Sequence, residues 1–215
     1  MRRTSQLTTL QNSACKRIWR LRNIAAAMPG GHSTQSIEIH LEYVTIETLN
    51  AWVNFIRAYY LSGLLGAKRC GPSRVRVSHV IANENAAIGQ AVLYWRRSAM
   101  PKPDGSWERR DEPTWHDPAS VLPICLARGF SNIADLQAAV STGTRVFRDL
   151  PVFRNYYAHR NQRTRKAAVD LAAIYGIVST TRPSDILLTR PLGRSQPLIL
   201  DWLDDLRFTI EYICY

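Results

Sequence analysis

The chain has little with which to hold a metal ion or a disulfide framework. Its four cysteines, Cys15, Cys70, Cys125 and Cys214, lie far apart and form no C-x-x-C pair. Neither a zinc site nor disulfide bonds are therefore indicated, and we expect buried free thiols in a reducing compartment. The five histidines show neither the H-x-x-x-H nor the H-E-x-x-H spacing of metal-binding helices. We expect no metal site and no cofactor.

Long apolar runs, internal repeats and low-complexity tracts are also absent. No run of about 18 apolar residues occurs, so the sequence predicts no membrane span. The segment Thr4–Ser13 follows two arginines, but it is polar and lacks the hydrophobic core of a secretion signal. The basic segment Arg17–Ala27 is compatible with an organelle transit peptide. A cytoplasmic location is the main expectation.

Positive charge is what the chain has in excess. The formal net charge is +11, and it is unevenly distributed. Residues 1–76 hold 11 Lys and Arg against 3 acidic residues, and residues 145–194 hold 10 against 3. Two basic stretches of this kind favour a polyanionic partner, of which RNA is the simplest. A basic surface that only maintains solubility is the alternative.

Apolar periodicity predicts an all-α protein. At 215 residues and 46% hydrophobic content, the chain fits one domain, residues 1–215, with a sizeable core. Apolar residues recur at intervals of three and four, as in amphipathic helices, and Pro29-Gly30-Gly31 separates the first helix from the second. The expected helices cover about residues 7–28, 36–65, 83–94, 118–127, 131–140, 150–161, 164–175 and 198–212.

Three segments do not follow this periodicity. Arg74–Val80 fits either a short strand or an extended loop, and Ile177–Gln196 contains prolines typical of a loop. Arg96–Trp115 has three prolines, an Asp-Gly pair and two tryptophans. We predict that it is a long loop inserted into the helical domain. Trp107 and Trp115 would either stack on nucleic-acid bases or anchor the loop to its own domain.

The segment Phe153–Arg160 is the most informative one for function. It places Arg154, Asn155 and His159 within six positions of a predicted helix. Asn155 and His159 are spaced i, i+4 and share a face, whereas Arg154 lies about 140° from His159. An imidazole can give or take a proton, and a guanidinium binds phosphate through paired N–H donors. These three residues suit attack by a ribose 2′-hydroxyl on its own phosphodiester. For this, the long arginine stem, or a helix start at this point, must bring the guanidinium close to the imidazole.

The segment Leu150–Arg165 resembles the Arg-(four to six residues)-His pattern of HEPN domains, and Asn155 matches the family's polar residue after the arginine. These are small all-helical proteins, and many are metal-independent endoribonucleases of toxin–antitoxin and anti-phage systems. The resemblance implies a HEPN-like helical bundle in which Arg154 and His159 are catalytic and Asn155 positions one of them or the scissile phosphate. It also implies a homodimer with facing motif helices, held in check by an antitoxin or another regulatory protein.

Residues that flank the motif are predicted to bind RNA. Two tyrosines would stack on bases or pack in the dimer, with one of them facing the core, and four cations would hold the flanking phosphates. These residues are Tyr156, Tyr157, Arg160, Arg163, Arg165 and Lys166. For the four cations, a solvated basic face is the alternative.

Two other functions also fit the sequence. One is a catalytically inactive HEPN-like module that binds RNA or forms oligomers. The other is a basic DNA-binding regulator, although no short Gly-containing turn joins two helices as in a helix-turn-helix. Cleavage of RNA in EDTA would distinguish the nuclease from both.

Overall fold

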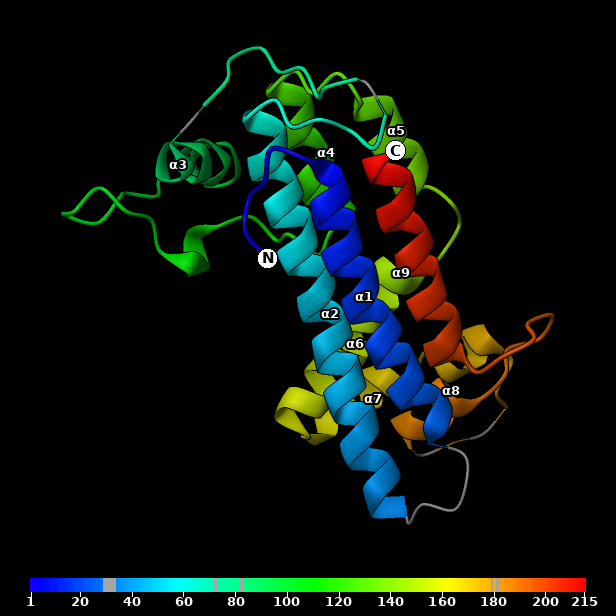
Figure 1. The fold of residues 1–215 in the computed structure, drawn as a ribbon. Helices are drawn as coiled ribbons and strands as arrows, with labels where there is room; N and C mark the ends of the chain where they lie inside the picture. The colour runs from blue at the N-terminus through cyan, green and yellow to red at the C-terminus, as the bar shows by residue number, and fades with distance from the viewer. Residues whose placement is uncertain (29–33, 72, 82, 179, 181) are drawn as a thin grey trace. The chain divides into compact units, whose positions relative to one another are not determined.

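The chain folds into α-helices joined by loops. The structure is a computed structural model that describes residues 1–28, 34–71, 73–81, 83–178, 180 and 182–215. Within these ranges there are nine α-helices, two short 3-10 helices and no strand (Figure 1). The prediction of an all-α protein is confirmed. The break expected at Pro29-Gly30-Gly31 lies outside the described residues.

The positions of the helices largely follow the periodicity of the sequence. In chain order they are α1 Leu7–Ala27, α2 Thr34–Leu64, α3 Glu84–Trp95, η1 Arg109–Asp111, α4 Pro118–Ala127, α5 Ile133–Val140, α6 Val146–His159, α7 Gln162–Val169, η2 Ala172–Tyr175, α8 Pro183–Leu188 and α9 Leu198–Cys214. Asn83 caps α3, as expected, because its side chain accepts hydrogen bonds from the N–H groups of Asn85 and Ala86. In the part of the chain that is described, no helix is long and apolar enough to cross a membrane.

Two parts of the prediction were wrong. The single helix expected over residues 164–175 is divided into α7 and η2. The segment 177–196, expected to be a loop, contains α8. Pro183 occupies the first position of α8, where the missing N–H of proline has no helical partner to lose. The proline that indicated a loop therefore begins a helix.

The described residues form two compact units. Unit 1 consists of Met1–Ala14, Val53–Gly143 and Thr209–Tyr215, and unit 2 consists of Cys15–Trp52 and Thr144–Phe208. Helices α1, α2 and α9 contribute residues to both units. All residues predicted for catalysis and RNA binding belong to unit 2. The single domain over residues 1–215 stays a prediction.

An aromatic cluster forms part of the core of unit 1. The ring of Tyr60 stacks on that of Phe130, with centroids 6.0 Å apart, and packs against Trp115 at 5.4 Å. Phe130 lies directly over Gly63 of α2, where a Cβ would come within 2.2 Å of its ring. Gly63 therefore allows the aromatic cluster to close against α2.

The tryptophans of the long loop anchor it to unit 1. Trp115 is 3% exposed and donates its indole N–H to Glu112 at 2.7 Å. Trp107 lies against Gly89 of α3, where a Cβ would come within 2.5 Å of the indole nitrogen. Both rings pack against their own unit, in agreement with a role in anchoring the loop.

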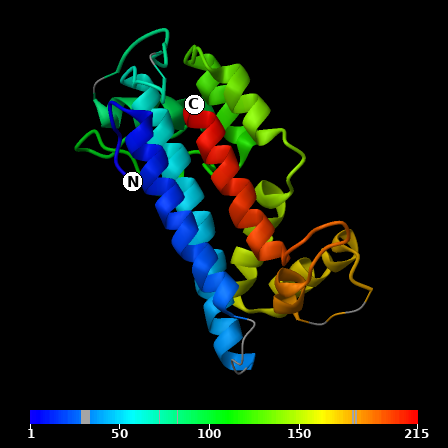
Figure 2. The ribbon, with the colours of Figure 1, turned by 45° about the vertical axis from the view of Figure 1, so that its right-hand side comes forward.

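Apolar packing and ion pairs connect the helices of unit 2. There, α1 and α2 lie side by side in both views (Figures 1 and 2). Arg17 of α1 forms an ion pair with Glu47 of α2. Trp52, at the end of the unit 2 part of α2, packs against Phe147 of α6 with ring centroids 4.8 Å apart. These contacts hold α6, which carries the Arg/His motif, within unit 2.

Candidate functional site

Helix α6 exposes the Arg/His motif because its other side is buried. Its buried residues recur at intervals of three and four: Val146, Asp149, Leu150, Phe153 and Tyr157. The ring of Phe153 packs edge-on against Trp202 of α9, with centroids 5.6 Å apart. The helix begins at Val146, so Arg154 lies well inside it and not at a helix start. A regular helix therefore fixes the direction in which each motif side chain leaves the backbone.

A buried carboxylate orients α6 within unit 2. Asp149 is 0% exposed and accepts hydrogen bonds from Arg145 Nε at 2.7 Å and from the Tyr175 hydroxyl at 2.6 Å. The hydrogen bond to Asp149 raises the pKa of Arg145, since it stabilises the charged guanidinium. Burial, followed by the hydrogen bond to Asp149, raises the pKa of Tyr175, which thus donates as a neutral phenol. The first turn of α6 is tied to η2 in this way.

Replacing Asp149 by asparagine is expected to destabilise the fold. Three hydrogen bonds to a carboxylate, two from Arg145 and one from Tyr175, would be weakened or lost. The expected cost is about 1.5–3 kcal/mol in the free energy of unfolding, measured by urea denaturation. Asp170→Asn is the matched control, because Asp170 is 59% exposed and pairs with Lys166, which is 74% exposed. The control should lose about 0.5 kcal/mol or less. Equal losses for the two variants would contradict a structural role for the Asp149 network.

Asn155 and His159 line one cavity beside the start of α7. The cavity has a volume of about 440 Å³ and is lined by Val152, Asn155, His159, Asn161, Arg163, Thr164 and Ala167. Asn155 and His159 are both exposed to solvent. The volume lies within the usual range for sites that bind small ligands. This arrangement agrees with the prediction that Asn155 and His159 share one face of the helix.

Arg154 reaches the same region through Asn155. Its guanidinium donates to the Asn155 side-chain oxygen across 3.5 Å, which is a long hydrogen bond. Arg154 is partly exposed and does not line the cavity. Among the described residues, no hydrogen bond joins Arg154 to His159. Asn155 is therefore the residue that both contacts Arg154 and lines the cavity with His159.

A tight turn without glycine joins α6 to α7. Arg160 has φ 43° and ψ 37° and is the one non-glycine residue with positive φ among the described residues. Its backbone N–H closes α6 by donating to Tyr156 O at 2.7 Å, and its guanidinium pairs with Glu42 of α2. Asn161 then begins α7, since its side chain accepts the N–H of Thr164 at 2.9 Å. The turn brings the His159 end of α6 directly next to the first turn of α7.

Among the flanking cations, Arg160 and Lys166 form ion pairs with acidic residues. Arg160 pairs with Glu42, and Lys166 pairs with Asp170 at 2.9 Å. Arg163 lines the cavity, and Arg163 and Arg165 are both exposed. Between Arg145 and Asp170 the chain holds seven Lys or Arg and two Asp, so this stretch of the sequence is strongly basic.

The two tyrosines of the motif have different environments. Tyr157 is 2% exposed and takes the core-facing position that was expected for one of the pair. Burial raises its pKa, and the nearby Glu38 carboxylate raises it further. Tyr156 is partly exposed and meets the Tyr157 ring edge-on at 4.9 Å. Only Tyr156 therefore offers part of its ring to a ligand.

Several residues of the cavity and of the turn after α6 were not predicted from the sequence. Asn161, Thr164, Val152 and Ala167 line the cavity, and Glu42 binds the turn. Asn161 could have been recognised from its type, because asparagine is a favoured N-cap. Glu42 gave no such signal, because it lies 118 residues before Arg160 and the two meet only in the folded chain.

Comparison with known proteins gives no assignment. No protein-family model, curated protein or solved structure matches this chain. Among the described residues, no group of three or more His, Cys, Asp and Glu side chains could hold a metal ion. What the site does must follow from Arg154, Asn155, His159 and the basic residues around them.

Proposed function

We propose that this chain is a HEPN-like endoribonuclease that cleaves RNA without a metal ion. One observation carries the proposal: Asn155 accepts a hydrogen bond from Arg154 and lines one cavity together with His159. A phosphate-binding group, a positioning amide and a proton carrier thereby lie along one helix. The all-α fold and the basic stretch of sequence around the motif support the same interpretation.

The reaction starts with attack of a ribose 2′-hydroxyl on the neighbouring phosphorus. His159 takes the proton of the 2′-hydroxyl or delivers one to the departing 5′-oxygen. Arg154 stabilises the negative charge that grows on the phosphate oxygens, and Asn155 positions the arginine or the phosphate. The P–O5′ bond breaks as the P–O2′ bond forms. The products are a 2′,3′-cyclic phosphate, or the 3′-phosphate formed from it, and a 5′-hydroxyl.

A second copy of the chain completes the site. In one chain His159 lines the cavity, but Arg154 does not. In a twofold dimer each α6 meets its own copy, so that the Arg154 of one chain can serve the His159 of the other. We therefore assign the active form to a homodimer with a composite cleft.

The flanking residues hold the RNA strand. Arg160, Arg163, Arg165 and Lys166 supply positive charge to the phosphates, and Tyr156 stacks on a base. An uncontrolled ribonuclease is toxic to its own cell. The chain therefore fits a toxin or an anti-phage effector whose activity an antitoxin or another protein restrains.

The test is RNA cleavage in EDTA with analysis of the product ends. The purified chain is expected to cut single-stranded RNA, to leave 2′,3′-cyclic phosphate and 5′-hydroxyl ends, and to leave DNA of the same sequence intact. Cleavage of both polymers, or 5′-phosphate ends, would exclude attack by the 2′-hydroxyl. RNA that binds but stays intact would instead favour the catalytically inactive module.

A second candidate, a DNA-binding regulator, is favoured by the turn between α6 and α7. Arg160 and Asn161 join two helices directly, and α7 exposes Arg163 and Arg165. A helix-turn-helix presents its second helix to the major groove in a comparable way. Sequence-dependent binding of duplex DNA, with no preference for RNA, would support this function over the nuclease.

A further inference from the structure

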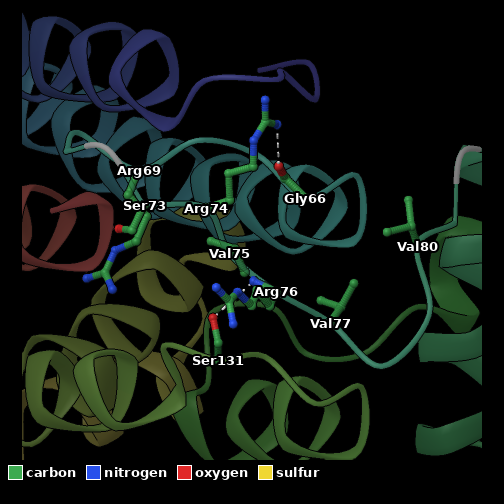
Figure 3. Close-up of a pocket in the computed structure, with 9 residues that line it drawn as sticks. All are labelled: Gly66, Arg69, Ser73, Arg74, Val75, Arg76, Val77, Val80 and Ser131. Carbon is green, nitrogen blue, oxygen red and sulfur yellow. Dashed lines mark hydrogen bonds between the residues drawn. The ribbon is translucent and has the colours of Figure 1, made fainter.

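Unit 1 contains a second basic pocket, which takes no part in the proposed reaction. It has a volume of about 820 Å³ and is lined by nine residues (Figure 3). Three of them are arginines, two are serines and none is acidic or aromatic. Arg69, Arg74 and Arg76 come from the segment that follows α2, and Ser131 precedes α5. The lining is therefore suited to an anion and offers no ring for stacking on a base.

The three arginines differ in how much of their charge is neutralised. Arg69 pairs with Asp135 at 2.6 Å, and its Nε is buried without a hydrogen-bond partner. Arg74 donates to the backbone oxygen of Gly66 at 3.1 Å, which leaves its charge uncompensated. Within the described ranges, the guanidinium of Arg76 has neither a hydrogen bond nor an ion pair. In the part of the chain that the structure describes, the exposed charges of Arg74 and Arg76 thus have no acidic partner.

Backbone hydrogen bonds hold the arginines in place. Val75 N donates to Ala67 O at 2.9 Å, and Val75 is 1% exposed. On the other side, Arg76 N donates to the Ser131 hydroxyl at 3.0 Å, and Ser131 N returns a bond to Arg76 O at 2.9 Å. Residues alternate in direction along an extended segment, so the burial of Val75 exposes both Arg74 and Arg76. The backbone of the pocket is formed before any ligand arrives, so binding has to order mainly the arginine side chains.

We propose that this pocket binds successive phosphate groups of a single-stranded RNA. Figure 3 shows the side chains of Arg69, Arg74 and Arg76 ending at separate places around the pocket and not at one point. That spacing suits a polymer with a phosphate at each nucleotide better than one isolated phosphate group. The absence of an aromatic lining residue favours contact with the backbone, and so little dependence on RNA sequence. The choice of RNA as the polyanion rests on the proposed function, whereas binding in this pocket does not require that the chain cleaves RNA.

The test measures binding of a labelled single-stranded RNA to Arg74→Ala/Arg76→Ala. All proteins carry His159→Ala, so that cleavage cannot interfere. Loss of two phosphate contacts should weaken binding roughly tenfold and make the slope of log K against log salt less steep by about 1.4. Arg97→Ala/Arg110→Ala is the matched control, since both arginines are exposed in unit 1, lie outside the pocket and remove the same charge. The control should keep most of the affinity.

Three outcomes would overturn the inference. Equal losses in the two double variants would show a general effect of net charge. Unchanged affinity in Arg74→Ala/Arg76→Ala would show that the pocket does not bind RNA. Circular dichroism of both double variants checks that they are folded. Competition by a nucleoside triphosphate as effective as that by RNA would identify a site for a small nucleotide. None of these outcomes depends on whether His159 and Arg154 cleave RNA.

Discussion

Replacing His159 by alanine is expected to lower the rate of RNA cleavage by about 10²–10⁴-fold, the usual contribution of a positioned acid or base. His159 is the last residue of α6 and is exposed, so its loss removes little packing. The melting temperature should therefore stay within a degree or two of that of the wild type. The rate is measured with a labelled RNA in EDTA under single-turnover conditions, which separates the chemical step from RNA binding.

His79→Ala provides the control for the loss of an exposed imidazole. His79 lies in unit 1, is also exposed and has no part in the cavity beside α7. Its replacement should leave the rate unchanged. If the two histidine variants cleave RNA equally fast, His159 has no role in proton transfer and the nuclease proposal fails.

Replacing Arg154 by alanine is expected to lower the cleavage rate by about 10²–10³-fold, as for other donors that stabilise a transition-state charge. Arg154→Lys keeps the charge but loses the paired donors, so it should recover only part of the rate. Arg148→Ala is the control on the same helix, because Arg148 is 74% exposed and belongs to no described cavity. A full rate with Arg154→Lys would assign Arg154 a purely electrostatic role.

Mixing the two inactive variants tests whether the site is shared between chains. In a dimer of one Arg154→Ala chain and one His159→Ala chain, the intact His159 and the intact Arg154 come from different chains. If the site is composite, an equal mixture should recover about a quarter of the wild-type rate, since half of the dimers are mixed and each has one complete pair. No recovery in dimers that form normally would mean that each chain works alone.

The regular helices were predictable because they depend on local signals. The apolar period of three and four set α1, α2, α4 and α9, and Asn83 marked the start of α3. The α8 segment was missed because Pro183 was interpreted as a loop residue, although proline is well suited to the first helical position. The interruption between α7 and η2 was missed because Ala167, Ala168 and Leu171 continue the helical period across it.

The common face of Asn155 and His159 was predictable from the sequence, but the turn that follows them was not. The spacing of Asn155 and His159 gave their common face, since a regular helix is enough to produce it. The left-handed backbone of Arg160 had no sequence signal, because glycine is the residue usually expected there. The ion pair of Arg160 with Glu42 connects distant parts of the chain, and no local pattern contains that information.

Because of the ion pair between Arg160 and Glu42, ionic strength is expected to affect this protein in two ways. Salt would weaken the proposed RNA binding by competing for the phosphates, and it also screens the partly exposed ion pair that holds the turn after His159. A fall in the cleavage rate with rising ionic strength would have two causes. The RNA strand would bind more weakly, and His159 would be positioned less firmly. Glu42→Gln removes the second contribution, and a separate measurement of RNA binding shows how far the released Arg160 changes the first.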